Sequence, residues 1–355
     1  MQRTLSVNPS RFLLMEVAMP ATQIDRIFGA LESAGYPREF QSSLLPDWVT
    51  SEMLQDEGAT LEVASILAKR LGLRVAPLFS DSPGLEDLRR RDTKYKRSIP
   101  NKSKNLSAAT SLAMFVAESI AYATPYEYIP FPQDPLQFRN EILGTEGGNW
   151  LGLRNLLQAC WRHGVPVIYL DEVCEGLPKM DGMVTMFEGR PVIILSKKSK
   201  SWAWQSFIIA HEIGHCALGH IDLDEILIDE TLGEQSYALD DPDVDEQAAD
   251  QYAITLLNGR ANATYGNGTG NMSALGLADA AMQYGKANRV DPGHVVLNFA
   301  KHNDAWALGM AAIKLLQAGE KPAGIVVNDL LWRCIRPDVL PDDTIDLLYR
   351  VAPAE

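Results

Sequence analysis

A long, largely apolar segment that carries two histidines constrains the fold of this chain more than any other part of its sequence. Residues 201–218 predict one helix, and its His211-Glu-Ile-Gly-His215 core separates the two imidazoles by four positions. Side chains at positions i and i+4 lie on one face of a helix, so both imidazoles point toward the same spot. The surrounding residues are apolar, which predicts that the helix is buried and holds the two rings still.

The spacing of these two histidines is that of a zinc site. Glu212 lies about 100° further round the helix than His211, close enough to reach a water on the metal without taking a metal position. Catalytic zinc has three protein ligands and one open position for water, so another ligand must come from elsewhere. The competing interpretation is a pair of buried, hydrogen-bonded histidines. With six histidines in 355 residues, chance alone produces this spacing in roughly one such chain in one or two hundred.

A second predicted helix, residues 241–257, supplies the missing ligand. Glu246 lies in it, 31 residues after His215, and Asp250 follows at i+4 on the same face. A carboxylate next to a metal-bound histidine can accept the ring N–H that faces away from the metal and so fix the tautomer. We therefore expect Glu246 to be the third ligand and Asp250 to hold a ligand histidine. The competing interpretation is the solvated acidic start of a helix, because four aspartates stand nearby: Asp240, Asp241, Asp243 and Asp245.

With zinc in place, these residues predict hydrolysis of a peptide bond. Zinc lowers the pKa of a bound water and polarises the scissile carbonyl, while Glu212 takes the proton and passes it to the leaving amine. A strand directly before the histidine helix could pair with an extended substrate; its central residues are Val192, Ile193 and Ile194. An oxyanion stabiliser is also expected. The sequence does not select among its three candidates, which are Tyr237, Tyr252 and His220.

The two segments together resemble the ImmA/IrrE (DUF955) metallopeptidases. That family shows (F/L)-x-x-A-H-E-(L/I/F)-G-H, followed later by E-x-x-A-(D/N)-x-(F/Y)-A-x-x-L-L. Here residues 207–220 are FIIAHEIGHCALGH and residues 245–257 are DEQAADQYAITLL. The family's second helix often ends in Leu-Met-Pro, whereas this one ends in Leu-Leu-Asn-Gly at 256–259. The resemblance covers residues 148–300 and implies a zincin-like α+β fold, one Zn²⁺ per chain and Glu246 as the third ligand.

The resemblance also implies a biological role. Members of the family act as regulatory proteases that cleave a helix-turn-helix repressor encoded nearby, in phage, mobile-element or DNA-damage responses. Many carry a helix-turn-helix module of their own. Two other classes of function stay open: a DNA-binding regulator with a structural metal site, and an interaction protein that holds a repressor without cutting it. An intact Glu212 favours the enzyme, since a purely structural site has no need of a base there.

The rest of the sequence predicts an α+β protein in four regions. Residues 1–80 form a helical, helix-turn-helix-like module, 81–105 a basic linker, 106–300 the zincin-like domain, and 301–355 a C-terminal extension of unknown role. The elements expected elsewhere, in chain order, are helices 21–33, 60–71, 108–123 and 151–163, strands 165–170, 183–187 and 191–195, a helix 274–288 and a strand 323–327.

Charge is distributed unevenly along the chain. The net charge of −14 repels nucleic acid and anionic membranes from the molecule as a whole. Residues 89–104 nevertheless form a basic run, which we expect to be a solvated connector rather than a nucleic-acid contact. The residues that could touch DNA there are Arg89, Arg90, Arg91, Lys94, Lys96 and Arg97.

The sequence also favours a soluble cytoplasmic protein. Its four cysteines are widely separated, which argues against a disulfide framework and a thiolate zinc cluster. No segment reaches the ~20 apolar residues that a membrane-spanning helix needs. The one signal-like run, residues 11–21, is short and interrupted by Glu16.

Overall fold

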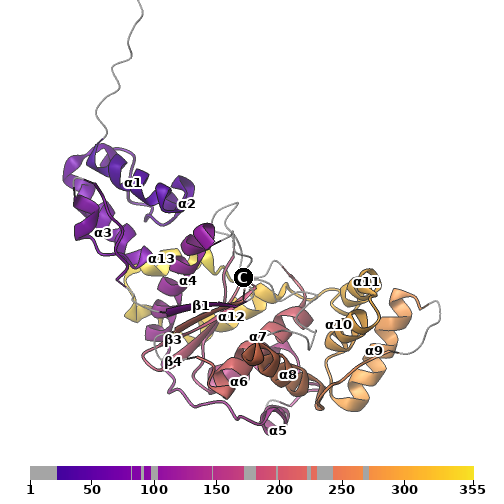
Figure 1. The fold of residues 1–355 in the computed structure, drawn as a ribbon. Coiled ribbons are helices and arrows are strands. Elements are labelled where there is room, and N and C mark those ends of the chain that lie inside the picture. Colours follow the sequence, from indigo (N-terminus) through magenta and orange to yellow (C-terminus); the bar gives the residue numbers. More distant parts are fainter. Residues whose placement is uncertain are drawn as a thin grey trace, which may run out of the picture.

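The computed structural model describes residues 22–80, 82–88, 92–96, 103–145, 147–171, 181–196, 199–221, 225–229, 243–266 and 272–355 (Figure 1). Its α-helices are α1 (Gln23–Ser33), α2 (Arg38–Ser43), α3 (Thr60–Leu71), α4 (Ser103–Ala123), α5 (Pro135–Thr145), α6 (Leu153–Arg162), α7 (Trp202–Leu218), α8 (Val244–Asn258), α9 (Ala274–Asn288), α10 (Pro292–His302), α11 (Trp306–Leu316), α12 (Ala323–Cys334) and α13 (Asp342–Val351). Its strands are β1 (Asp92–Lys96), β2 (Val167–Tyr169), β3 (Gly182–Phe187), β4 (Arg190–Leu195) and β5 (Glu225–Asp229). Helices combined with one sheet make this an α+β protein, as the sequence predicts.

The five strands form one mixed sheet in the order β1-β5-β3-β4-β2. β3 and β4 form the predicted antiparallel hairpin, and both turn residues, Glu188 and Gly189, have positive φ, as a two-residue hairpin turn requires. β2 runs parallel to β4, β5 runs antiparallel to β3, and β1 runs parallel to β5. The β3–β4 hairpin is therefore enclosed by other strands on both sides.

Helices cover both faces of this sheet (Figure 1). Successive side chains of a strand point to opposite faces, so each face of β4 joins a different core. Ile193 packs in the core that contains α6, α7, α8 and α10, whereas Val192 and Ile194 pack in the core that contains α4 and the N-terminal helices α1 to α3. The sheet thus separates the histidine helix α7 from the N-terminal module.

Local sequence fixes both ends of α7 and of α8. Ser201 caps α7 by accepting a hydrogen bond from the Trp204 amide at 3.4 Å, and Gly219, with φ of 72°, ends it in the left-handed conformation. Asp243 caps α8 by accepting a hydrogen bond from the Asp245 amide at 3.0 Å. The predicted start of α8 at residue 241 was therefore wrong, because Asp243 rather than Asp241 is the capping residue.

Two further expectations about secondary structure were wrong. Residues 323–327 are not a strand but the first part of α12, which follows Pro322 and continues through Leu330 and Leu331. A short apolar run alone does not distinguish a buried strand from a buried helix. The segment predicted to be a basic linker contains strand β1, which pairs with β5 along its whole length.

Helix prediction was otherwise accurate where caps mark the ends. α3 and α9 have the predicted bounds, and α3 ends at Gly72, which is left-handed. α5 was not predicted; it follows a Pro-rich bend and begins where Asp134 accepts a hydrogen bond from the Leu136 amide at 2.9 Å. Among the helices of the described ranges, none is both long and apolar enough to cross a membrane.

The C-terminal helices are built into the cores on both faces of the sheet. Val296 of α10 and Val327 of α12 are fully buried in the core around α7. On the opposite face, the buried Arg70 of α3 donates a hydrogen bond to the backbone carbonyl of Asp343 in α13 at 2.7 Å. Residues 301–355 therefore connect the N-terminal module to the histidine helix.

Candidate metal centre

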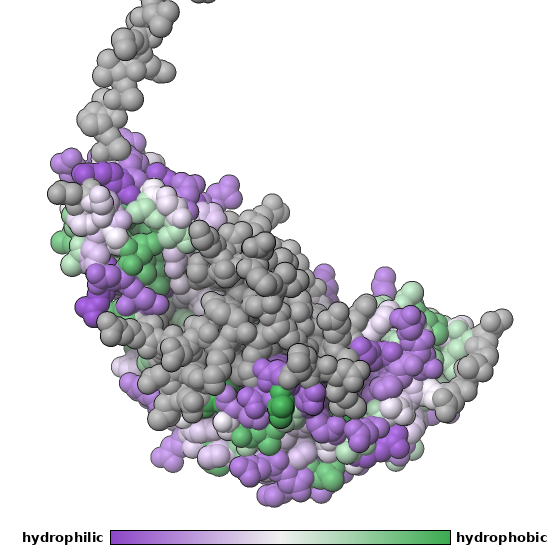
Figure 2. Space-filling view, in the orientation of Figure 1, coloured by the Kyte–Doolittle hydropathy of each residue, from purple (hydrophilic) through white to green (hydrophobic). Residues whose placement is uncertain are grey.

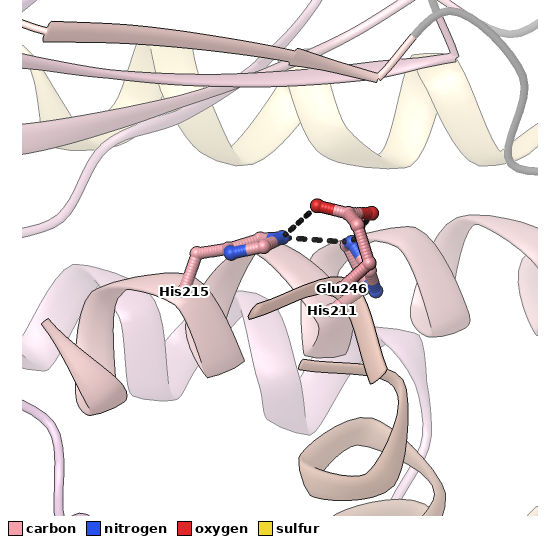
Figure 3. Close-up of side chains that lie close together, drawn as sticks. All are labelled: His211, His215 and Glu246. Atoms are coloured by element: carbon pink, nitrogen blue, oxygen red, sulfur yellow. Dashed lines mark hydrogen bonds and ion pairs between the residues drawn. The ribbon is translucent and has the colours of Figure 1, made fainter. Parts of the chain in front are cut away.

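A close approach of α7 and α8 brings three side chains with ligand atoms together. A Cβ added at Gly214 would lie 3.1 Å from the backbone of Ala249, so a larger residue there would push the two helices apart. His211 and His215 project from α7 and meet Glu246 from the first turn of α8 (Figure 3). The Nε2 atoms of His211 and His215 are 2.9 Å apart. Glu246 places Oε2 3.4 Å from Nε2 of His211 and Oε1 3.3 Å from Nε2 of His215.

These separations fit a single metal ion. Ligand atoms placed tetrahedrally at the bond lengths usual for zinc lie about 3.3 Å from one another. The three observed distances between ligand atoms are close to that value, so a small outward movement of the two rings would admit the ion. His211, His215 and Glu246 could therefore hold a metal. Imidazole and carboxylate ligands suit several divalent transition metals as well as zinc.

Burial and charge prepare Glu246 to act as a ligand. The side chains of His211, His215 and Glu246 have no exposed surface. Burial alone would raise the pKa of Glu246, but hydrogen bonds from His211 and His215, together with their charge, outweigh burial and hold that pKa well below its usual range. The group is therefore a carboxylate, the form that binds a metal.

Each ligand histidine also contacts a residue on the side away from Glu246. Asp250 Oδ1 lies 2.8 Å from Nδ1 of His211, the contact expected from the spacing of Glu246 and Asp250. His215 uses a different partner, since its Nδ1 lies 3.0 Å from Nδ1 of His220. The sequence suggested no such role for His220, which was predicted only as a candidate oxyanion stabiliser. In the structure its ring faces His215 instead.

Glu212 lies on α7 beneath strand β3. Its side chain is fully buried. A Cβ added at Gly182, the first residue of β3, would overlap Glu212 Oε1 and Ile208, so a larger residue there would force the strand or one of these side chains to move. Sequence reasoning missed Gly182, because a single glycine at a strand end gives no signal of which side chain lies under it.

The structure contradicts the substrate-pairing role predicted for β4. Val192, Ile193 and Ile194 are fully buried, and β4 pairs with β3 on one side and with β2 on the other. Ile193 pairs with both Val184 and Val167, so no backbone edge remains there for a substrate. The apolar run after the Glu188-Gly189 turn identified a strand correctly, but the hairpin prediction did not give the place of that strand in the sheet.

The oxyanion candidates are not brought to one place. Tyr252 is buried on α8, and its hydroxyl donates a hydrogen bond to the Pro132 carbonyl at 2.7 Å, which uses its only proton. His220 faces His215, as described above. Tyr237 lies outside the described residues, and so do four members of the basic run: Arg89, Arg90, Arg91 and Arg97. For Lys94 and Lys96 the structure describes only the backbone, in β1.

The described N-terminal helices carry both acidic and basic residues on their surface. Their surface mixes hydrophilic and hydrophobic residues (Figure 2). On α3 the exposed residues include Leu61, Glu62 and Lys69, whereas Arg70 is buried and bonded to the carbonyls of Leu44 and Asp343. Of the two cationic residues of α3, only Lys69 is therefore exposed.

The arrangement as a whole is a buried cluster on two packed helices that could hold one metal ion. Two imidazole nitrogens and one carboxylate converge on a single point. A partner stands behind each imidazole, and a further buried carboxylate, Glu212, lies on α7 with the two histidines.

Compared with known proteins, the chain matches no family model, no curated protein and no solved structure.

Proposed function

We propose that the chain is a zinc-dependent endopeptidase. The observation that carries the proposal is the presence of Glu212, a second fully buried carboxylate next to His211 on α7. A carboxylate is costly to bury, and a metal site with a purely structural role has no need of a base at this position. General-base catalysis gives a reason for its position, because the base must lie beside the ligand face without being a ligand itself.

Each residue of the centre then has a defined task. His211, His215 and Glu246 would hold one Zn²⁺, which supplies a Lewis acid and lowers the pKa of water. Glu212 would accept a proton from the attacking water and transfer it to the nitrogen of the leaving amine. Asp250 would keep the proton of His211 on Nδ1, so that Nε2 keeps the lone pair that binds the metal.

The two motifs add a class of substrate to this proposal. Their resemblance to ImmA/IrrE metallopeptidases supports a zincin-like domain around α7, α8 and the β3–β4 hairpin. It also supports a regulatory role in a stress, phage or mobile-element response. The proposed substrate is accordingly a helix-turn-helix repressor encoded near this protein.

One observation favours a second candidate, a regulator that binds its repressor and whose metal site is not catalytic. His211, Glu212, His215 and Glu246 all have no exposed surface, whereas a substrate peptide has to reach Glu212. The endopeptidase proposal therefore requires that the chain covering the site moves when substrate binds. The second candidate requires no such movement.

The substitution Glu212→Gln separates the two candidates. The neighbouring repressor is incubated with zinc-loaded wild type and with the variant, and cleavage is followed by mass spectrometry. We expect cleavage to fall on the order of 10²- to 10⁴-fold, the usual contribution of a general base, while the bound zinc per chain is unchanged. Glu62→Gln, an exposed change of the same chemistry on α3, is the matched control and should leave cleavage unaltered.

Two results would contradict the endopeptidase. One is a stable complex with the repressor and no cleaved product from zinc-loaded wild type, which supports the second candidate. The other is equal cleavage by wild type and Glu212→Gln, which removes Glu212 from the mechanism.

A further inference from the structure

The two histidines of the metal centre are held by chemically different partners. A carboxylate, Asp250, lies 2.8 Å from Nδ1 of His211. Nδ1 of His215 instead faces another imidazole, that of His220, at 3.0 Å, with the two ring planes at 67°. The far nitrogen of His220, Nε2, lies 3.8 Å from Asp245 Oδ1. The second histidine is therefore backed by an imidazole, with a carboxylate one step further out.

The end of α7 is what turns His220 toward His215. Gly219 adopts φ of 72°, so the chain reverses after Leu218. The backbone amide of His220 then donates a hydrogen bond to the carbonyl of His215 at 3.0 Å. This bond fixes the His220 backbone against the last turn of the helix. The His220 side chain is only 12% exposed, so the ring is also held by its surroundings.

The chemistry of two facing imidazoles fixes the direction of their hydrogen bond. His215 must keep a lone pair on Nε2 to bind a metal, so in its neutral form the proton is on Nδ1. His215 Nδ1 then donates to His220 Nδ1, which has to carry a lone pair. The proton of neutral His220 is consequently on Nε2, the nitrogen that faces Asp245. One arrangement of protons therefore satisfies the contact between His215 and His220, and it directs the Nε2–H of His220 toward Asp245, whose Oδ1 lies 3.8 Å away.

We propose that His220 is a positioning residue that sets the tautomer and ring orientation of His215, with Asp245 supporting it from behind. This inference rests on the metal centre of the proposed function and deepens it. It differs from that proposal because it concerns metal binding alone and holds whether or not the metal is catalytic. A neutral imidazole is a weaker acceptor than a carboxylate. His220 therefore holds His215 less strongly than Asp250 holds His211.

Metal affinity tests the proposal directly. The full chain is titrated with Zn²⁺ against a chromophoric chelator, and the Co²⁺-loaded protein is examined by visible absorption, which reports the ligand geometry around the ion. His220→Ala should raise the Kd for zinc by roughly 10- to 100-fold, the usual effect of removing a partner behind a ligand histidine. It should also shift the cobalt band. His302→Ala, which removes an exposed histidine at the end of α10, is the control and should change neither.

A conservative variant distinguishes positioning from support of the fold. The carbonyl oxygen of asparagine can accept the His215 N–H from near the place of His220 Nδ1, so His220→Asn should recover most of the affinity lost in His220→Ala. Wild-type affinity and an unchanged cobalt band in His220→Ala would overturn the proposal. So would equal losses in the alanine and asparagine variants. If wild type binds zinc but cleaves nothing, the endopeptidase proposal fails and this one stands. If wild type binds no metal, both fail.

Discussion

The α7–α8 pair carries a buried histidine cluster toward each of its ends, and the two clusters differ in chemistry. Toward the start of α8, His211 and His215 meet Glu246. Toward its other end, Asn258 meets His294 of α10. The ring of Phe207 lies next to both clusters, with its centroid 6.3 Å from that of His211 and 6.4 Å from that of His294.

In the cluster around His294, donors and acceptors alternate. Asn258 Nδ2 donates to His294 Nε2 at 3.0 Å, and the Tyr265 hydroxyl donates to Asn258 Oδ1 at 2.6 Å. Burial, aided by the charge of Arg139, lowers the pKa of His294 to about 3, so this histidine is neutral at ordinary pH. A chain of neutral hydrogen bonds of this kind stabilises the fold without any ion.

In the metal cluster, by contrast, the two histidines face hydrogen-bond acceptors on every side that the preceding distances describe. The two histidine Nε2 atoms and the two carboxylate oxygens of Glu246 point toward one another, and each of these four atoms lies within 3.4 Å of another of the four. Lone pairs aimed at one point repel one another unless a proton or a cation lies between them. All three histidines are fully buried, so burial does not distinguish them. The difference is that donors and acceptors alternate around His294, the structural histidine, whereas lone pairs converge at the candidate ligands His211 and His215.

The largest expected effect tests that distinction with one substitution in each cluster. His211→Ala should raise the Kd for zinc by more than about 100-fold, because it removes a ligand rather than a partner behind one. His294→Ala should leave zinc binding unchanged and lower the free energy of unfolding by about 1–3 kcal/mol, since one of the two N–H groups of the buried Asn258 amide loses its acceptor while the other still donates to Ile254. Chelator competition and urea unfolding measure the two quantities. Full zinc occupancy in His211→Ala would rule out the proposed ligand set.

The metal cluster could be predicted from the sequence because it depends on spacing within helices. Two histidines four residues apart share a helix face, and so do Glu246 and Asp250. His220 could not be assigned in this way, because its direction depends on the left-handed Gly219 and on the turn that follows. Gly182 was missed for a related reason: its importance comes from Glu212 beneath it, which is distant in sequence.

Much of the helical fold could be predicted for the same reason, whereas strand order could not. Both α3 and α9 have the predicted bounds: the left-handed Gly72 marks the end of α3, and the capping Ser273 marks the start of α9. The apolar run at residues 191–195 and the turn before it revealed a strand but not its second neighbour, so an interior strand was mistaken for a substrate-binding edge. The run 323–327 was too short to show a helical period, and its place in α12 depends on residues that follow it.

The next effect in size is a pH dependence of stability that comes from the His294 cluster. The pKa of His294 is about 3 in the folded protein and about 6.5 in an unfolded chain, so the unfolded state binds the proton more tightly. Stability contributed by the neutral ring is therefore fully present above pH 6.5 and is lost as pH falls toward 3. The loss is about 1.4 kcal/mol per pH unit, or about 3 kcal/mol by pH 4.5.

His294→Gln isolates this dependence. Glutamine cannot titrate in this range, and its carbonyl oxygen can accept the hydrogen bond from Asn258. Urea unfolding of both proteins from pH 7 to 4.5, with a chelator present to remove metal, should show a shallower decline for the variant. Parallel curves for the two proteins would mean that His294 is not held neutral by burial, and the contrast between the clusters would weaken.

The smallest effect concerns strand β3, whose first residue lies against Glu212. Gly182→Ala places a methyl group against Glu212 and Ile208, and such overpacking costs about 1–3 kcal/mol of stability. Because the strand or the carboxylate must move, cleavage of the repressor should also fall.

Gly144→Ala is the matched control. Its Cβ, on the exposed side of α5, meets nothing within 4 Å. The higher helix propensity of alanine should therefore raise the free energy of unfolding by about 0.5–1 kcal/mol and leave cleavage unchanged. If urea unfolding shows that Gly182→Ala lowers the free energy of unfolding while Gly144→Ala raises it, β3 presses on Glu212. Equal signs would mean that β3 is loose over the site, and access to Glu212 would then need no movement of that strand.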